Sequence, residues 1–171
     1  MKYSDQGIYR GSWKNNRREG EGVLTFPDGT KYDGEWKDDT FNGMGKYLLA
    51  NGEEYEGSWV DGKRHGDGTQ KFANGDIYKG HWENGKHQGN GKFVWKNGDM
   101  YFGEFANDLH NGIGKLTWIN GEEYQGSWVD GKRDGFGVMK FSDGNIYEGN
   151  WKNGKQEGKG ELIWKNGNMY V

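Results

Sequence analysis

The chain has 171 residues, a formal net charge of −3 and no cysteine. So small a charge gives no strong field for nucleic acid, and the absence of thiols excludes disulfides and cysteine chemistry. No stretch resembles a secretory signal or reaches the length of a transmembrane helix, so a cytoplasmic protein is expected. Apolar residues make up only 31% but aromatic residues 16%, so order must depend on where the aromatic residues lie.

A period of 23 residues organises the sequence, with tyrosines at 9, 32, 55, 78, 101, 124, 147 and 170. When each tyrosine is counted as position 1, glycine occupies positions 3, 12, 14 and 21 of all seven repeats. Residues 32–100 and 101–169 are identical at 40 of 69 aligned positions, which indicates the duplication of a three-repeat block. Tyr3 and Tyr170 fit the same frame, so a single array over residues 1–171 with partial repeats at both ends is predicted.

Each repeat is predicted to contain two β-strands, as the first repeat illustrates. Residues 9–13 alternate with a period of two and predict a strand. A turn follows at Asn16, position 8, where every repeat has Gly, Asn or Asp, so a positive φ is expected. Residues 20–26 predict the second strand, and Asp28 with Gly29 predicts the hairpin turn into the next repeat. Recurrence of these elements predicts an all-β protein, an elongated, twisted, single-layer antiparallel meander of tandem β-hairpins that resembles a solenoid.

The faces of this sheet follow from parity. If the two strands of a repeat pair without a bulge, positions 1, 3, 5, 12, 14 and 18 lie on one side, and rings can lie flat over glycine. This predicts an aromatic-on-glycine core. Position 18 is Leu49 in the second repeat and aromatic in the others: Phe26, Phe72, Trp95, Trp118, Phe141 and Trp164. The opposite face carries apolar residues on its second strands, so some apolar area should stay exposed: Met44, Leu48, Val94, Ile113, Phe136, Val138 and Ile163.

The pattern Tyr-x-Gly-x-Trp-x-x-Gly-x-x-x-Gly-x-Gly is complete at residues 55–68, 78–91, 124–137 and 147–160. It resembles the signature of the MORN repeat (membrane occupation and recognition nexus). The resemblance implies the hairpin-array fold. It leaves the function open, because such repeats occur in lipid-kinase regulatory regions, membrane-junction proteins, ciliary and cytoskeletal scaffolds, and beside methyltransferase domains.

No catalytic residue, metal site or cofactor is expected. The four histidines occupy positions 11, 4, 10 and 10 and form no ladder through the array: His65, His81, His87 and His110. Glu53 and Glu54 are adjacent, as are Glu122 and Glu123, so within a strand their side chains would point to opposite faces and could not share a proton. The Gly-x-Gly steps open no helix and therefore match no phosphate loop.

Basic and acidic residues fall in different turns of the repeat, which predicts a basic edge and an acidic edge of the sheet. The turn after position 5 carries Arg17, Arg18, Lys63, Arg64, Lys86, His87, Lys132, Arg133 and Lys155. The opposite turn carries Glu53, Glu54, Asp76, Asp99, Glu122 and Glu123. The second and fifth repeats interrupt the basic edge.

The leading functional hypothesis is a scaffold without enzymatic activity that binds a partner helix or extended peptide along an aromatic groove, because aromatic residues are the usual affinity anchors. Its candidate contacts are Tyr32, Trp36, Tyr55, Trp59, Tyr78, Trp82, Trp95, Tyr101, Phe105, Trp118, Tyr124, Trp128, Tyr147 and Trp151.

The alternative hypothesis is a peripheral membrane module that binds phosphoinositides or other anionic lipids through the basic edge. Its candidate contacts are Lys63, Arg64, Lys86, Lys132, Arg133 and Lys155. Self-association through open strand edges is compatible with either hypothesis. Association with the cytoskeleton or a membrane is the expected cellular setting, and nucleic acid is not an expected partner.

Overall fold

A computed structural model describes residues 7–170, so Tyr3 lies outside the described residues. The chain divides into two compact units, residues 1–86 and 87–171, and each is described by itself. The expectation that all seven repeats form one domain stays a prediction. Tyr170, at the other end of the repeat frame, lies in a short final strand.

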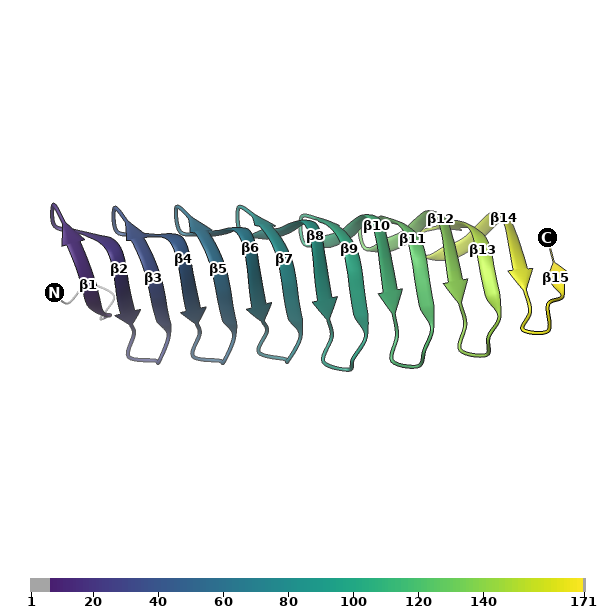
Figure 1. Cartoon of the computed structure of the whole chain (residues 1–171), viewed down its shortest axis with the longest axis horizontal. Helices are drawn as coiled ribbons and strands as arrows, with labels where there is room; N and C mark the ends of the chain where they lie inside the picture. The colour runs from purple at the N-terminus through teal and green to yellow at the C-terminus, as the bar shows by residue number, and fades with distance from the viewer. Residues whose placement is uncertain (1–6, 171) are drawn as a thin grey trace. The chain divides into compact units, whose positions relative to one another are not determined.

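The first unit is an antiparallel meander in which each strand pairs with the next along the chain (Figure 1). Its strands are β1 (Ile8–Lys14), β2 (Arg17–Thr25), β3 (Lys31–Lys37), β4 (Thr40–Leu48), β5 (Glu54–Val60), β6 (Lys63–Lys71) and β7 (Ile77–Glu83).

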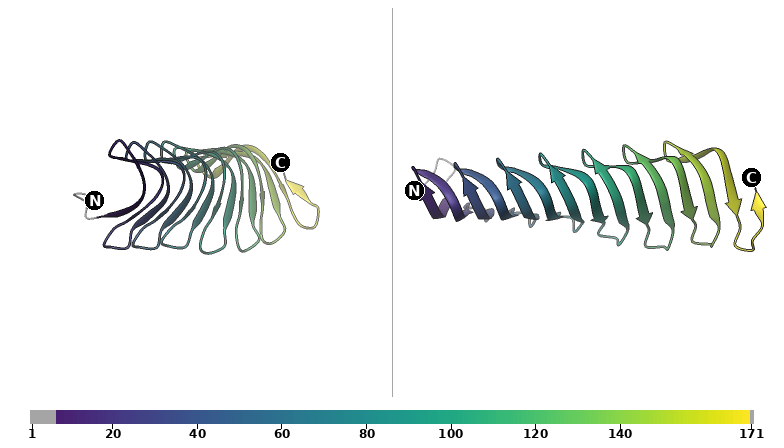
Figure 2. Two further views of the ribbon diagram at one scale, coloured as in Figure 1. Left: turned by 60° about the vertical axis from the view of Figure 1, so that its left-hand side comes forward. Right: turned by 45° about the horizontal axis from the view of Figure 1, so that its top comes forward.

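The second unit has the same design, and the strands of both units are curved rather than flat (Figure 2). Its strands are β8 (Lys86–Val94, starting at the boundary), β9 (Met100–Ala106), β10 (Leu109–Thr117), β11 (Glu123–Val129), β12 (Lys132–Lys140), β13 (Ile146–Lys152), β14 (Lys155–Ile163) and β15 (Met169–Tyr170). The expected single-layer meander is confirmed within each unit, with two strands per repeat.

The turn after the first strand of each repeat has two residues, and both adopt a positive φ. In the first repeat these are Asn15 at 49° and Asn16 at 61°. Every repeat has a positive φ at position 8, as predicted, which is the geometry of a type I′ hairpin turn. The N–H of position 8 also donates to the position-10 carbonyl of the preceding repeat, as from Gly62 to Phe41 at 2.9 Å. The turn thus joins neighbouring repeats as well as neighbouring strands.

The second turn is longer than the two-residue hairpin that Asp28 and Gly29 predicted. Residues 26–30 separate β2 from β3, and Gly29 has a φ of 91°. Phe26 N–H donates to the Thr30 carbonyl at 2.8 Å, and Gly29 N–H donates to the Phe26 carbonyl at 3.0 Å. The glycine still supplies the positive φ, but it does so inside a wider loop.

A bulge interrupts the pairing inside each fully described hairpin, which corrects the assumption of a regular register. In β1–β2 the register shifts between Gly11 and Trp13, and Gly20 at position 12 has a φ of 73°. Position 12 therefore needs glycine for its backbone, not to make room for a ring. The bulge places Trp13 directly opposite Arg18, so position 10 lies beside position 5.

Positions 3 and 14 need glycine for space. A Cβ added at Gly57 would lie 2.6 Å from the Cα of Gly68 and 2.6 Å from the Tyr55 hydroxyl oxygen. The tyrosine ring lies over this glycine pair, and its hydroxyl donates to the Ser58 carbonyl at 3.0 Å. The same hydrogen bond from position 1 to position 4 occurs in every repeat, so the position-1 rings lie over glycine as predicted. The position-18 side chains, predicted to join this core, are half-buried, and Trp164 is exposed.

Candidate binding face

The position-1 tyrosines and the position-5 rings are the core, and they make edge-to-face contacts along each unit. Trp36 lies 5.2 Å from Tyr32 of its own repeat and 5.2 Å from Tyr9 of the preceding repeat, measured between ring centroids. The Trp36 indole N–H donates to the carbonyl of Gly22 at 2.9 Å. The indole N–H groups of Trp59, Trp128 and Trp151 make the equivalent hydrogen bond, so each of these residues links its repeat to the one before.

Most of the predicted groove contacts are buried beneath other side chains. Twelve of the fourteen rings are buried, and only Trp95 and Trp118 are half-buried. The tyrosines at 32, 78, 101 and 124 are 0% exposed. These rings support the surface, and direct contact between them and a partner stays a prediction.

The side chains at position 10 lie over this core, and we call them the cover residues: Arg18, Phe41, Arg64, His87, His110, Arg133 and Gln156. Phe41 stacks on Tyr32 with centroids 3.8 Å apart, and His110 stacks on Tyr101 at 3.7 Å. Sequence reasoning assigned this position to the turn and missed its role. The available signal was that all seven side chains are planar.

The three arginines among the cover residues lie over the tryptophan of the following repeat. The guanidinium carbon is 4.3 Å from the Trp36 ring for Arg18, 4.8 Å from Trp82 for Arg64 and 4.2 Å from Trp151 for Arg133. Such contacts are favourable because the ring face is electronegative.

This placement corrects the expected basic edge, because Arg64 and Arg133 are half-buried on the aromatic face. The predicted lysines do stand exposed at the turn: Lys63, Lys86, Lys132 and Lys155.

The acidic edge is also corrected in part. Glu54 lies 3.0 Å from the Lys46 ammonium and 3.4 Å from that of Lys71, on the face opposite the aromatic core. The ammonium groups, Lys46 first, hold the pKa of Glu54 below its usual value. Glu123 lies between Lys115 and Lys140 in the same way, as the duplication of the three-repeat block requires. Both carboxylates therefore neutralise lysines of the back face.

The back face exposes apolar side chains, as expected. Of the predicted residues, Met44 is 56% exposed, Ile113 57% and Phe136 55%, and Phe102, which was not predicted, is 64% exposed. The other four predicted members of this set are half-buried.

A hollow of about 290 Å³ opens on the aromatic face of the first unit. It combines rings, an aliphatic side chain and an ion pair, and its lining is Arg18, Leu24, Phe26, Trp36, Asp39, Thr40, Phe41 and Gly62. The Arg18 Nε lies 3.1 Å from the Asp39 carboxylate, so positive and negative charge meet at its wall. The hollow offers apolar contact together with hydrogen-bonding groups, which is the usual makeup of a binding pocket.

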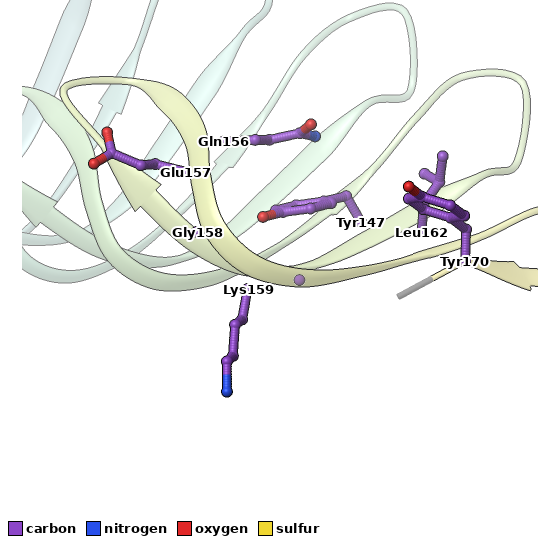
Figure 3. Close-up of a pocket in the computed structure, with 8 residues that line it drawn as sticks. Tyr147, Gln156, Glu157, Gly158, Lys159, Leu162 and Tyr170 are labelled. Atoms are coloured by element: carbon purple, nitrogen blue, oxygen red, sulfur yellow. The ribbon is translucent and has the colours of Figure 1, made fainter.

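A second pocket lies beside Tyr147 in the second unit (Figure 3). Gln156, the cover residue of this repeat, lies next to the Tyr147 ring, and Leu162 and Tyr170 close the other side. In the preceding repeat the equivalent tyrosine, Tyr124, contacts Trp151 at 5.2 Å.

Burial of the core sets the proton affinities on this face. It raises the pKa of Tyr55 and of Tyr124 to about 12, and also raises the pKa of Tyr32 and Tyr101, so the phenols stay protonated and donate to carbonyls. Burial lowers the pKa of His110 to about 4, so its imidazole is neutral at pH 7.

Metal-binding clusters and membrane-spanning helices are both absent from residues 7–170. These residues contain no group of three or more His, Cys, Asp or Glu side chains placed to hold a metal ion. They also contain no helix with the length and apolarity needed to cross a membrane.

Comparison with solved structures finds two related domains at low sequence identity. The chain is 17% identical to the SAS-4 (dCPAP) TCP domain of Drosophila melanogaster, solved in complex with a proline-rich motif of Ana2 (dSTIL), over 74% of this chain and 70% of that one, with a TM-score of 0.48. It is 13% identical to the TCP10 domain of Danio rerio CPAP over 100% of this chain and 96% of that one, with a TM-score of 0.36.

No curated protein matches the chain. The family model of the MORN repeat matches seven consecutive segments: residues 9–31, 32–54, 55–77, 78–100, 101–123, 124–146 and 147–169. These segments start at the predicted tyrosines and cover most of the sequence. The chain therefore belongs to the MORN repeat family.

Proposed function

We propose that the chain is a scaffold without enzymatic activity that binds a partner peptide or helix on its aromatic face. The observation that carries this proposal is the hollow of about 290 Å³ bounded by Arg18, Phe26 and Phe41. The cover residues present planar, polarisable groups above a fixed aromatic core, so a partner meets a surface that is already organised. Such preorganisation lowers the entropic cost of binding.

A random-peptide display library provides the test. Among the peptides enriched on the wild-type chain, some should lose affinity when Phe26→Ser removes a half-buried ring from the hollow. Ile8→Ser is the control, because Ile8 is 52% exposed and pairs with Thr25 on the back face. Equal losses for the two variants, or no enriched peptide at all, would contradict the proposal.

Binding to anionic membranes is the alternative function, and the exposed lysines at position 9 favour it: Lys63, Lys86, Lys132 and Lys155. Each lysine near an anionic surface contributes about 1 kcal/mol, and the attraction weakens with salt. The alternative predicts flotation with phosphoinositide vesicles at low salt, and loss of flotation when all four lysines become glutamine.

The matched control for the membrane test changes the ion-paired lysines 46, 71, 115 and 140 to glutamine. It removes the same charge from the back face. If both quadruple variants lose binding equally, net charge and not the turn edge is responsible, and the alternative fails.

A further inference from the structure

The three arginines among the cover residues differ in the groups that neutralise their positive charge. Arg18 is paired with the Asp39 carboxylate and also donates to the Asp39 carbonyl at 3.0 Å. Arg64 donates to the Gln70 side chain, and the Gln70 amide donates in turn to the Glu53 carboxylate. In both cases the positive charge is connected to a carboxylate of the same unit.

Arg133 is the equivalent of Arg64 in the second of the duplicated blocks, but no side chain links its guanidinium to a carboxylate. Met139 stands where the earlier block has Gln70, and it offers only a sulfur 3.9 Å from the guanidinium. The remaining polar contact of Arg133 is a hydrogen bond from Nη2 to the Gly154 carbonyl at 2.9 Å. Among residues 7–170, no carboxylate lies within ion-pair distance of Arg133.

This arrangement leaves an unneutralised cation on a largely apolar surface. Burial lowers the pKa of Arg133, although the more distant Glu122 carboxylate favours its charge. A guanidinium has five N–H donors, and the two contacts above use only part of them. Because water is partly excluded, an added carboxylate would interact more strongly here than at an exposed arginine.

The side chains around Arg133 indicate which other group of a peptide would bind beside its carboxylate. In the first repeat, the hollow beside Arg18 is lined by positions 16 and 18 of its own repeat and by residues of the next repeat. The equivalent positions around Arg133 hold Met139, Phe141 and the exposed Lys155. Met139 is only 5% exposed, so the site combines the half-buried ring of Phe141 with a second positive charge.

We propose that the sixth repeat selects a partner peptide by binding an Asp or Glu side chain at Arg133, with an apolar residue of the same peptide packed on Phe141. This inference rests on the proposed peptide-binding function and specifies its ligand. The first and third repeats lack this selectivity because Asp39 and the Gln70–Glu53 pair already satisfy their arginines.

The test repeats the random-peptide selection with three variants. Arg133→Gln removes the charge and keeps a planar cover residue, as Gln156 naturally does in the seventh repeat. Met139→Gln restores the link from Arg133 toward Glu122 and leaves Arg133 itself in place. Gln70→Met is the matched control in the earlier block, because it removes the Gln70 link between Arg64 and Glu53 and leaves Arg133 and its neighbours unchanged.

The expected result is that one group of the peptides enriched on the wild-type chain carries Asp or Glu next to an apolar residue and keeps its affinity on Phe26→Ser. An enriched peptide should lose about tenfold or more in affinity when its acid is changed to the amide, or on Arg133→Gln or Met139→Gln. Gln70→Met should leave the affinity of these peptides unchanged. Thermal unfolding of each variant verifies that the fold is retained.

Two outcomes separate this inference from the function on which it rests. The absence of acidic peptides from the enriched set, or acidic peptides that bind Arg133→Gln as well as the wild type, would overturn the inference and leave peptide binding intact. If no peptide is enriched, both fail.

Discussion

At the scale of single residues, position 10 shows that the chemistry of a side chain can change while its packing is kept. Several planar cover residues occupy this position and lie over the same aromatic core. Phe41 and His110 occupy equivalent places one block apart and stack on their tyrosines at nearly the same distance, 3.8 and 3.7 Å. The phenyl ring stacks without a titratable group, whereas the imidazole carries a site for a proton. A difference in pH response between the two repeats follows.

His110 should make the stability of the protein depend on pH between about 6.5 and 4. Burial lowers its pKa from 6.5 to about 4, so in this interval the unfolded chain binds a proton that the folded chain excludes. The free energy of unfolding should therefore fall as the pH drops through the interval. Below about pH 4 both states are protonated, and this contribution becomes constant.

His110→Phe should remove that component, which urea unfolding at a series of pH values would measure against the wild type. Phe41→His is the matched control and should add a component of the same sign. If the difference between His110→Phe and the wild type does not change with pH, the imidazole is not held neutral by burial.

At the scale of the β-hairpin, glycine has two separable roles. Gly57 would clash if it carried a Cβ, because Gly68 and Tyr55 lie 2.6 Å away. A Cβ on Gly52 would meet nothing within 4 Å, but this glycine adopts a φ of 85°. The first role is close approach of the strands to the ring, and the second is backbone conformation.

Alanine substitutions should show that the two roles of glycine differ in their contribution to stability. Gly52→Ala should cost about 1–2 kcal/mol, the penalty of a left-handed backbone. Gly57→Ala should cost more, about 3 kcal/mol, because it separates two strands and displaces a core tyrosine. Chemical denaturation of both variants gives the comparison, and a smaller loss for Gly57→Ala would contradict the close-packed glycine pair.

Much of the hairpin could be predicted from the sequence because its signals are local. The 23-residue period, the strands and the positive φ at position 8 follow from glycine spacing and turn chemistry. The bulge could not be foreseen, because a glycine at position 12 fits either a regular strand or a kink. In a regular register without the bulge, Arg64 and Arg133 would be exposed turn residues, so the cover residues were not recognised from the sequence.

The burial of the predicted groove rings was equally hard to foresee. A sequence shows that rings recur on one face, but it does not show whether another side chain lies over them. Trp82 is 1% exposed and contacts both Tyr55 and Tyr78 edge to face, and Tyr78 is 0% exposed. The same aromatic pattern therefore predicted the core correctly and left the surface above it undefined.

At the scale of the whole molecule, the duplicated blocks keep their core and diverge in the side chains around it. Residues 32–100 and 101–169 share the tyrosines, the paired glycines and the glutamate–lysine clusters. They differ at Gln70 and Met139, and on the back face at Asp67 and Phe136. The core sets the fold of each unit, and the substituted positions are where binding specificity is expected to differ.

The most direct test of a fold held together by its aromatic core is the stability of Trp82→Ala, compared with Val60→Ala as an exposed control. Trp82 contacts Tyr55 and Tyr78 edge to face at 5.2 Å, whereas Val60 is 45% exposed. We predict that Trp82→Ala lowers the free energy of unfolding by about 3–5 kcal/mol and that Val60→Ala changes it by less than about 1 kcal/mol. Equal unfolding curves for Trp82→Ala and the wild type would contradict this role of the core.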